Sequence, residues 1–171
     1  KVLIIGANGF LGRKLVQKFQ STCTTFAADL NKTGFPFSVP FTSLDITKEL
    51  EVKTTIGKIK PDLVILTAAM TNVDACEDYP QNAMEINGKA PGYVANAVHE
   101  VQGKLIHIST DFIFDGEKGN YLETDVPNPI SVYGESKLQG EKNILRKWIP
   151  ALICRTSVLY GWPDADQHDN F

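Results

Sequence analysis

Residues 2–19 read VLIIGANGFLGRKLVQKF, in which a short apolar run, three glycines and a helical pattern follow one another directly. The β-branched run Val2–Ile5 predicts a strand. The apolar residues recur at helical spacing up to Phe19, which predicts a helix that begins as soon as the glycine turn ends. The stretch therefore predicts a strand, a tight turn and a helix.

The three glycines of this turn, Gly6, Gly9 and Gly12, are spaced as in a dinucleotide-binding turn. The first permits the tight turn, the second lets the backbone approach a pyrophosphate, and the third lets the helix pack on the strand. The amides at the helix N-terminus would then face the phosphates. A glycine triplet between a strand and a helix is a much stronger signal than the triplet alone.

A second chemical signal is a tyrosine and a lysine four residues apart, Tyr133 and Lys137. On a helix this spacing places both side chains on one face, so the ammonium can lie close to the phenol. A nearby cation favours the phenolate, and we therefore expect the pKa of Tyr133 to fall toward the range useful for acid-base catalysis. Thr110, just after the apolar run Leu105–Ile108, can place a hydroxyl beside the same reacting oxygen. The alternative is a chance pair on an exposed helix.

Strand and helix patterns alternate six times, which predicts an α/β fold with a doubly wound parallel sheet in the order 3-2-1-4-5-6. The expected strands are Val2–Ile5, Thr24–Ala28, Phe41–Ser43, Leu63–Leu66, Leu105–Ile108 and Ala151–Arg155. After the first helix, the expected helices are Lys48–Ile59, Ala83–Val101 with a kink or break at Pro91, and Val132–Trp148.

Composition limits the other classes of function. The chain has 171 residues, 43% of them hydrophobic, which favours one domain with one core. A net charge of -3 gives no basic surface for nucleic acid, and no apolar run is long enough to span a membrane. The three cysteines lack metal or disulfide spacing, so we expect a reducing, cytoplasmic location.

The second strand ends at Asp29, 23 positions beyond Gly6. A carboxylate there can accept hydrogen bonds from the adenosine ribose hydroxyls and would repel a 2′-phosphate, which favours NADH. Asn31 and Lys32 follow directly and could hold that phosphate, so NADH and NADPH both remain open. The alternative is that Asp29 is only a turn residue.

Two motifs together carry a resemblance to a known family. The spacing G-x-x-G-x-x-G with Y-x-x-x-K resembles the extended short-chain dehydrogenase/reductase family. Within it, STDFIFDG (109–116), YLETD (121–125) and NPISVYGESKLQGE (128–141) are similar to the dTDP-4-dehydrorhamnose reductases. The resemblance extends from Val2 to about Gly161.

The resemblance implies NADH- or NADPH-dependent reduction of the 4-keto group of dTDP-4-dehydro-L-rhamnose. Tyr133 would give the proton, Lys137 would hold the nicotinamide ribose and lower the tyrosine pKa, and Thr110 would hydrogen-bond the developing alkoxide. The alternative is a cofactor-binding regulatory subunit without turnover, because the regulatory subunit of methionine adenosyltransferase resembles these reductases along the same stretch.

The resemblance also implies a set of contacts. Asp45 and Ile46 would lie against the adenine, although Asp45 or Thr47 could instead cap the following helix. Asn87 is expected to face the sheet and support the active-site strand. The other cofactor contacts would come from Gly6, Gly9, Phe10, Leu11, Gly12, Asp29, Ala68, Ala69, Met70, Ile108, Tyr133 and Lys137, and the substrate contacts from Thr110, Asp111 and Val158.

The domain organisation expected from this resemblance is a nucleotide-binding domain over residues 1–161. Residues 162–171 would begin a loop toward a substrate lobe that is mostly missing from the chain, because family members continue beyond this length. Some relatives dimerise through bound Mg²⁺, which leaves a homodimer and Mg²⁺ open here. The expected partner is a nucleotide-sugar, with no nucleic acid and no membrane.

Overall fold

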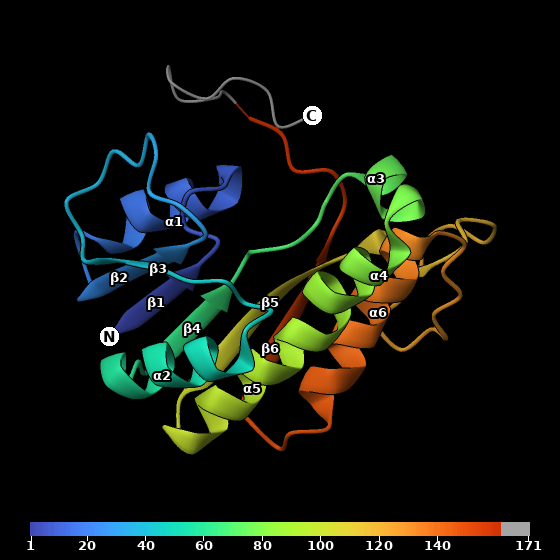
Figure 1. Ribbon diagram of the computed structural model, residues 1–171. Helices are drawn as coiled ribbons and strands as arrows, with labels where there is room; N and C mark the ends of the chain where they lie inside the picture. Colours follow the sequence, from blue (N-terminus) through green and yellow to red (C-terminus); the bar gives the residue numbers. More distant parts are fainter. Residues whose placement is uncertain (162–171) are drawn as a thin grey trace.

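Six parallel strands form one sheet, in the order β3-β2-β1-β4-β5-β6, in the computed structural model, which describes residues 1–161 (Figure 1). This confirms the predicted doubly wound sheet and its strand order. The expectation for residues 162–171 lies outside the described residues. The strands are β1 (Val2–Ile5), β2 (Thr25–Asp29), β3 (Phe41–Ser43), β4 (Leu63–Leu66), β5 (Lys104–Thr110) and β6 (Ala151–Thr156).

Helices cover the two faces of the sheet (Figure 1). They are α1 (Phe10–Phe19), α2 (Glu49–Ile59), α3 (Val73–Asp78), α4 (Pro80–Ala83), η1 (Met84–Lys89), α5 (Ala90–Glu100), η2 (Asp111–Ile113) and α6 (Val132–Leu145). Side chains of α2, α5 and α6 share one core cluster with the sheet, whereas α1 and the 35–41 segment form a second cluster on the opposite face. None of the helices in the described part has the length and apolarity to span a bilayer.

The central strands are buried on both faces, as an unbroken apolar run in a parallel sheet requires. In β1, Leu3 and Ile5 belong to the cluster with α2 and α5, whereas Val2 and Ile4 belong to the cluster with α1. This alternation fixes the register of the sheet, because a shift by one residue would exchange the two sets of side chains.

The region predicted as one helix with a break at Pro91 is interrupted earlier. A π-helical turn, η1, separates α4 from α5, and Pro91 lies in the first turn of α5. Proline has no N–H, so the carbonyl of Asn87, four residues earlier, has no helical donor there. The extra residue of a π-turn lets the chain accommodate this loss, and π-turns are often found at functional sites.

Helix α6 begins where predicted and ends at Leu145, three residues before the predicted end. Ser131 caps its N-terminus by accepting a hydrogen bond from the Gly134 amide at 3.1 Å. Glu77 of α3 accepts another from the Val132 amide at 2.8 Å, which ties α3 to this helix. Trp148, the predicted last residue, takes a left-handed conformation with φ at +52° and so lies outside the helix.

Two glycines let α6 lie unusually close to its neighbours. A Cβ at Gly134 would lie 2.2 Å from the backbone oxygen of Phe112, and one at Gly140 would lie 2.3 Å from the backbone oxygen of Asn87. Neither contact can relax by moving a flexible side chain, because both atoms belong to the backbone. The position of α6 therefore depends on the absence of side chains at these two residues.

We predict that Gly140→Ala lowers the free energy of unfolding by about 2 kcal/mol or more, since overpacking against backbone forces the helix to move. The matched control is Gly57→Ala in α2, where a Cβ would meet nothing within 4 Å. That change should stabilise the protein by about 0.5 to 1 kcal/mol, because alanine is the better helix former. Urea unfolding measures both, and equal effects would contradict the close packing of α6.

Candidate functional site

The glycine turn between β1 and α1 has the geometry that a nucleotide-binding turn requires. Gly6 has φ at +87°, and a Cβ there would lie 2.4 Å from the backbone nitrogen of Ala68. A Cβ at Gly12 would lie 2.0 Å from the backbone oxygen of Gly6. At Gly9 a Cβ would meet only that same oxygen, at 3.4 Å, so the protein itself does not crowd this position. The N-terminus of α1 has no side-chain cap, which leaves its first amides for a ligand.

Asp29 at the end of β2 is joined to the glycine turn. Its carboxylate accepts hydrogen bonds from the amides of Asn8 at 2.8 Å and Leu30 at 2.7 Å. A carboxylate has about four acceptor positions, so two amides leave capacity for ribose hydroxyls. Lys32 lies against the ring of Phe41, with its nitrogen 5.8 Å from the ring centroid.

Asn8 and Arg13 form a support of this corner that the sequence-based prediction missed. The Asn8 side chain donates to the backbone oxygens of Thr33 at 2.9 Å and Asn31 at 3.3 Å. The buried Arg13 guanidinium donates to the Asn8 side-chain oxygen at 2.8 Å and to its backbone oxygen at 3.1 Å. The signal was a polar residue inside the glycine turn with an arginine five positions later.

Neither Asp45 nor Thr47 caps α2, so that alternative is wrong. The N-cap of α2 is Lys48, without a side-chain cap. The Asp45 carboxylate instead accepts hydrogen bonds from the Thr47 amide at 2.9 Å and hydroxyl at 2.7 Å, and these bonds lower the pKa of Asp45. Ile46 beside it is buried. Asp45 therefore forms a short turn that orders the chain between β3 and α2.

The segment after β4 is held in place by Asn87. The Asn87 side chain accepts from the Met70 amide at 2.8 Å and donates to the Met70 backbone oxygen at 2.9 Å. Its amide nitrogen also lies 3.1 Å from the Ser136 hydroxyl on α6. One side chain from the π-helical turn thus connects the 68–70 segment with the helix that carries Tyr133 and Lys137.

Thr110, Tyr133 and Lys137 meet at the carboxyl end of β5. Thr110 is the last residue of that strand, and its hydroxyl donates to the Asp111 carboxylate at 3.3 Å and also interacts with the Tyr133 phenol. Lys137, one turn after Tyr133 on α6, donates to the backbone oxygen of Ile108 at 2.6 Å. Phe112 packs edge-on against the tyrosine ring, with centroids 5.7 Å apart.

The predicted fall in the pKa of Tyr133 is wrong. Burial raises the pKa of this phenol above 10.0, and the hydrogen bond with Thr110 offsets only part of the shift. The lysine does not reverse it, because the Lys137 ammonium is directed to the Ile108 carbonyl. Spacing alone could not reveal this, since desolvation depends on the packing around both groups. At neutral pH the phenol keeps its proton and is ready to donate it.

Lys137 is almost fully buried, and this burial disfavours the charged form of its side chain. Burial lowers the pKa of Lys137 from 10.5 to about 8, against the opposing pull of Glu141. Burial, and then the lysine itself, hold the pKa of His107 well below 6.5. Within the described residues neither ring nitrogen of His107 has a hydrogen-bond partner. His107 is therefore a neutral core residue beside the lysine.

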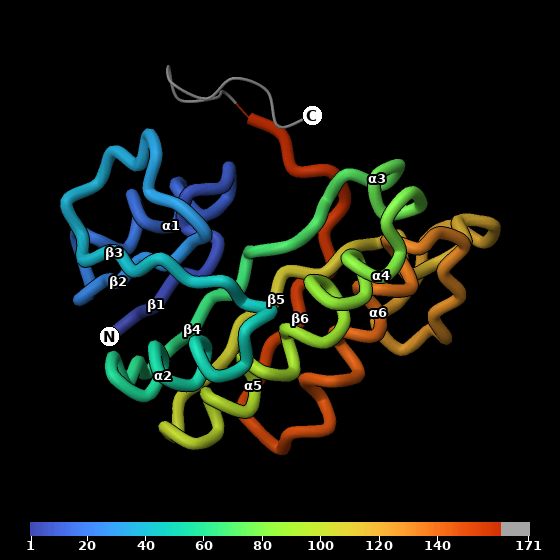
Figure 2. Tube along the Cα trace, in the orientation of Figure 1, coloured from blue at the N-terminus to red at the C-terminus, as the bar shows by residue number. Residues whose placement is uncertain are grey.

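The other proposed substrate contacts are exposed. Asp111 follows Thr110 in η2, and Val158 is exposed on the segment that leaves β6. This segment runs from the end of β6 toward the N-terminus of α1 (Figure 2), where a Cβ at Gly161 would lie 3.0 Å from the Phe10 ring. Residues 157–161 thus cross the carboxyl edge of the sheet between the glycine turn and the Tyr133–Lys137 pair.

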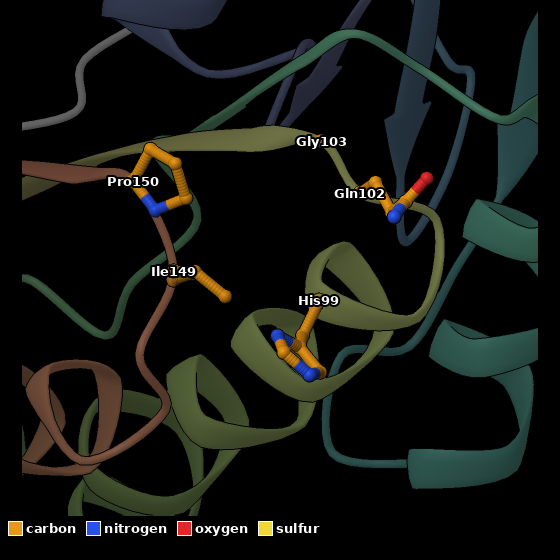
Figure 3. Close-up of a pocket in the computed structure, with 5 residues that line it drawn as sticks. All are labelled: His99, Gln102, Gly103, Ile149 and Pro150. Atoms are coloured by element: carbon orange, nitrogen blue, oxygen red, sulfur yellow. The ribbon is translucent and has the colours of Figure 1, made fainter.

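A separate hollow of about 330 Å³ lies at the other edge of the sheet. It is lined by His99, Gln102, Gly103, Ile149 and Pro150 (Figure 3), which precede β5 and β6. Because Thr110 stands at the opposite end of β5, the hollow does not belong to the candidate site. Over residues 1–161, no group of three or more His, Cys, Asp or Glu side chains is placed to hold a metal ion.

The fold and this site define a Rossmann-type nucleotide-binding domain with a tyrosine-lysine pair at the carboxyl edge of its sheet. The chain belongs to the RmlD substrate binding domain family, whose model matches residues 1–171.

Three relatives illustrate the range of the family. The chain is 39% identical over 159 residues to a probable low-salt glycan biosynthesis reductase, Agl14, of Haloferax volcanii, covering 92% of this chain and 53% of the relative. It is 35% identical over 162 residues to methionine adenosyltransferase 2 subunit beta of Bos taurus, covering 94% and 47%. The structure of dTDP-4-dehydrorhamnose reductase from Bacillus anthracis in complex with NADP matches with a TM-score of 0.85 and 34% identity, covering 95% and 55%. The chain thus spans about half the length of these relatives.

The lowered pKa of Lys137 predicts a dependence of stability on pH. The native state releases this proton near pH 8, whereas the unfolded chain keeps it until about 10.5, so the unfolded state binds more protons in between. Stability should therefore rise with pH, by about 1.5 kcal/mol between pH 8 and 9.5. Urea unfolding should show this gain in the wild type and in the exposed control Lys142→Met, but not in Lys137→Met. The same pH slope in all three proteins would contradict the burial of a titrating lysine.

Proposed function

We propose that the protein reduces the 4-keto group of dTDP-4-dehydro-L-rhamnose with NADH or NADPH. The observation that carries this proposal is the meeting of Thr110, Tyr133 and Lys137 at the carboxyl end of β5. The Bacillus anthracis structure, a dTDP-4-dehydrorhamnose reductase with NADP, supports the choice of substrate and cofactor.

The residues present fit a nicotinamide dinucleotide. The uncapped N-terminus of α1 and the uncrowded Gly9 suit a pyrophosphate, and the Asp29 carboxylate has acceptor capacity for the ribose. We assign the holding of the cofactor to Gly6, Gly9, Phe10, Leu11, Gly12, Asp29, Asp45, Ile46, Ala68, Ala69, Met70, Ile108, Tyr133 and Lys137. When bound, the cofactor supplies a hydride to the carbonyl carbon.

The side chains supply the proton and stabilise the charge. Tyr133 donates its proton to the carbonyl oxygen, and its raised pKa keeps it in the donating form at neutral pH. Thr110 hydrogen-bonds the same oxygen as negative charge develops there. Lys137 holds the nicotinamide ribose with its ammonium, while Asp111 and Val158 face the sugar. Residues 1–161 act as the nucleotide-binding domain.

A second candidate is a regulatory subunit that binds the cofactor without turnover. The similarity to methionine adenosyltransferase 2 subunit beta favours it, and the presence of Thr110, Tyr133 and Lys137 does not discriminate. Depletion of NADH by the full-length protein with dTDP-4-dehydro-L-rhamnose does. Steady oxidation supports the reductase, whereas tight cofactor binding without oxidation supports the subunit.

Removal of the Tyr133 hydroxyl should abolish proton donation and leave the cofactor site intact. We predict that Tyr133→Phe lowers kcat roughly 10²- to 10⁴-fold with little change in NADH affinity. Tyr79→Phe, at a tyrosine exposed on the surface, is the control and should retain the wild-type rate. A near-normal rate for Tyr133→Phe would remove this residue from the mechanism.

Asp29 should decide the choice of cofactor. A 2′-phosphate about 4 Å from its carboxylate costs on the order of several kcal/mol at an effective dielectric of 20, so NADH should bind at least as tightly as NADPH. Asp29→Asn should increase NADPH affinity, because the amide no longer repels the phosphate. Fluorescence titration compares both cofactors, with the exposed Asp78→Asn as the charge control. Wild-type binding of NADPH about tenfold tighter than NADH would contradict this role of Asp29.

A further inference from the structure

A buried ion pair lies directly behind the Tyr133–Lys137 pair. Glu141, one turn after Lys137 on α6, is 1% exposed. Its carboxylate accepts from the Arg155 guanidinium at 2.8 and 3.1 Å, and the Ser109 hydroxyl lies 2.5 Å from one of its oxygens. These partners come from β6 and β5, so the pair connects the helix with both strands that end at the site.

The position of Glu141 creates a competition for the lysine. Residues four apart on a helix are neighbours on one face, so an unpaired Glu141 would attract the Lys137 ammonium toward the middle of α6. In the structure both carboxylate oxygens are engaged by Arg155, in the two-point geometry that favours arginine over lysine. Lys137 points the other way, to the Ile108 oxygen at the carboxyl end of β5.

Arg155 itself is fixed by contacts beyond Glu141. Its remaining guanidinium nitrogen donates to the Glu123 backbone oxygen at 3.2 Å. Its guanidinium carbon lies 5.5 Å from the centroid of the Phe114 ring, which is stacked on Tyr121. On β6, Arg155 is paired in register with Ser109, next to the pair of Thr156 and Thr110. The guanidinium is therefore held in one orientation.

We propose that Arg155 is a positioning residue of the site: by occupying both oxygens of Glu141, it keeps that carboxylate from pairing with Lys137 and leaves the ammonium directed to the carboxyl edge of the sheet. The proposal rests on the proposed role of Lys137 in holding the cofactor. Within residues 1–161, the titratable groups that interact electrostatically with Lys137 are Glu141 from α6 and the neutral His107 from β5.

The test measures the pKa of Lys137 in the full-length protein by NMR of ¹³C-labelled lysine, with the signal assigned from Lys137→Met. Arg155→Met leaves Glu141 unpaired and should raise the pKa by roughly half a unit or more, because the ammonium gains a free anion. Glu141→Gln removes the group that raises the pKa and should lower it. The double variant with Arg155→Met and Glu141→Gln should have a Lys137 pKa close to that of the wild type. The exposed control Arg146→Met should have the wild-type Lys137 pKa.

Cofactor titration of the same proteins completes the test. At pH 7, Arg155→Met should bind NADH about fivefold more weakly or worse, Arg155→Lys should recover part of the loss, and the double variant should recover most of it. A purely structural arginine would lower Tm and leave the Lys137 pKa unchanged. An unchanged NADH affinity in Arg155→Met would overturn the proposal. If Arg155→Met does not fold, Glu141→Gln, which keeps the side-chain shape, replaces it, and an unchanged pKa of Lys137 in that variant would overturn the proposal. Failure of the proposed reductase activity would appear separately, as cofactor binding without NADH oxidation.

Discussion

The close approach of α6 to its neighbours is the constraint on which the rest of the site depends. Gly134 and Gly140 place the helix against the backbones of Phe112 and Asn87, where any side chain would collide with a carbonyl oxygen. This packing removes water from Tyr133 and Lys137 and so produces the shifted pKa of each. The close packing of α6 thus determines both the positions and the protonation states of these two side chains.

The topology of the sheet brings the glycine turn and the Tyr133–Lys137 pair to the same edge. Parallel strands end at one edge, so the turn after β1 and the end of β5 both lie there, separated only by β4. The segment after β4 is clamped by Asn87 through both polar groups of the Met70 backbone. The same asparagine contacts Ser136 on α6, so one residue holds both the segment after β4 and the helix that carries Tyr133.

The sequence predicted the parts of the molecule that depend on local pattern. The apolar runs gave the strands, and the crossover rule gave their order. Packing across the fold could not be predicted from local pattern. Burial reversed the expected pKa shift of Tyr133, and the alternative in which Asp45 or Thr47 caps α2 failed because the two side chains bind each other. The pair of Glu141 and Arg155 was missed because its members are close only after β6 has joined the sheet. The residue contacts assigned to cofactor and sugar stay predictions.

In the proposed reductase, the side chains on β5 and α6 direct a hydride to one carbon of a nucleotide-sugar. Incubation of the full-length protein with dTDP-4-dehydro-L-rhamnose and NADH deuterated at both C4 positions tests it most directly. We expect one deuterium at C4 of the sugar in the product, detected by mass spectrometry and NMR. Recovery of the keto sugar without deuterium, or deuterium at another carbon, would contradict it.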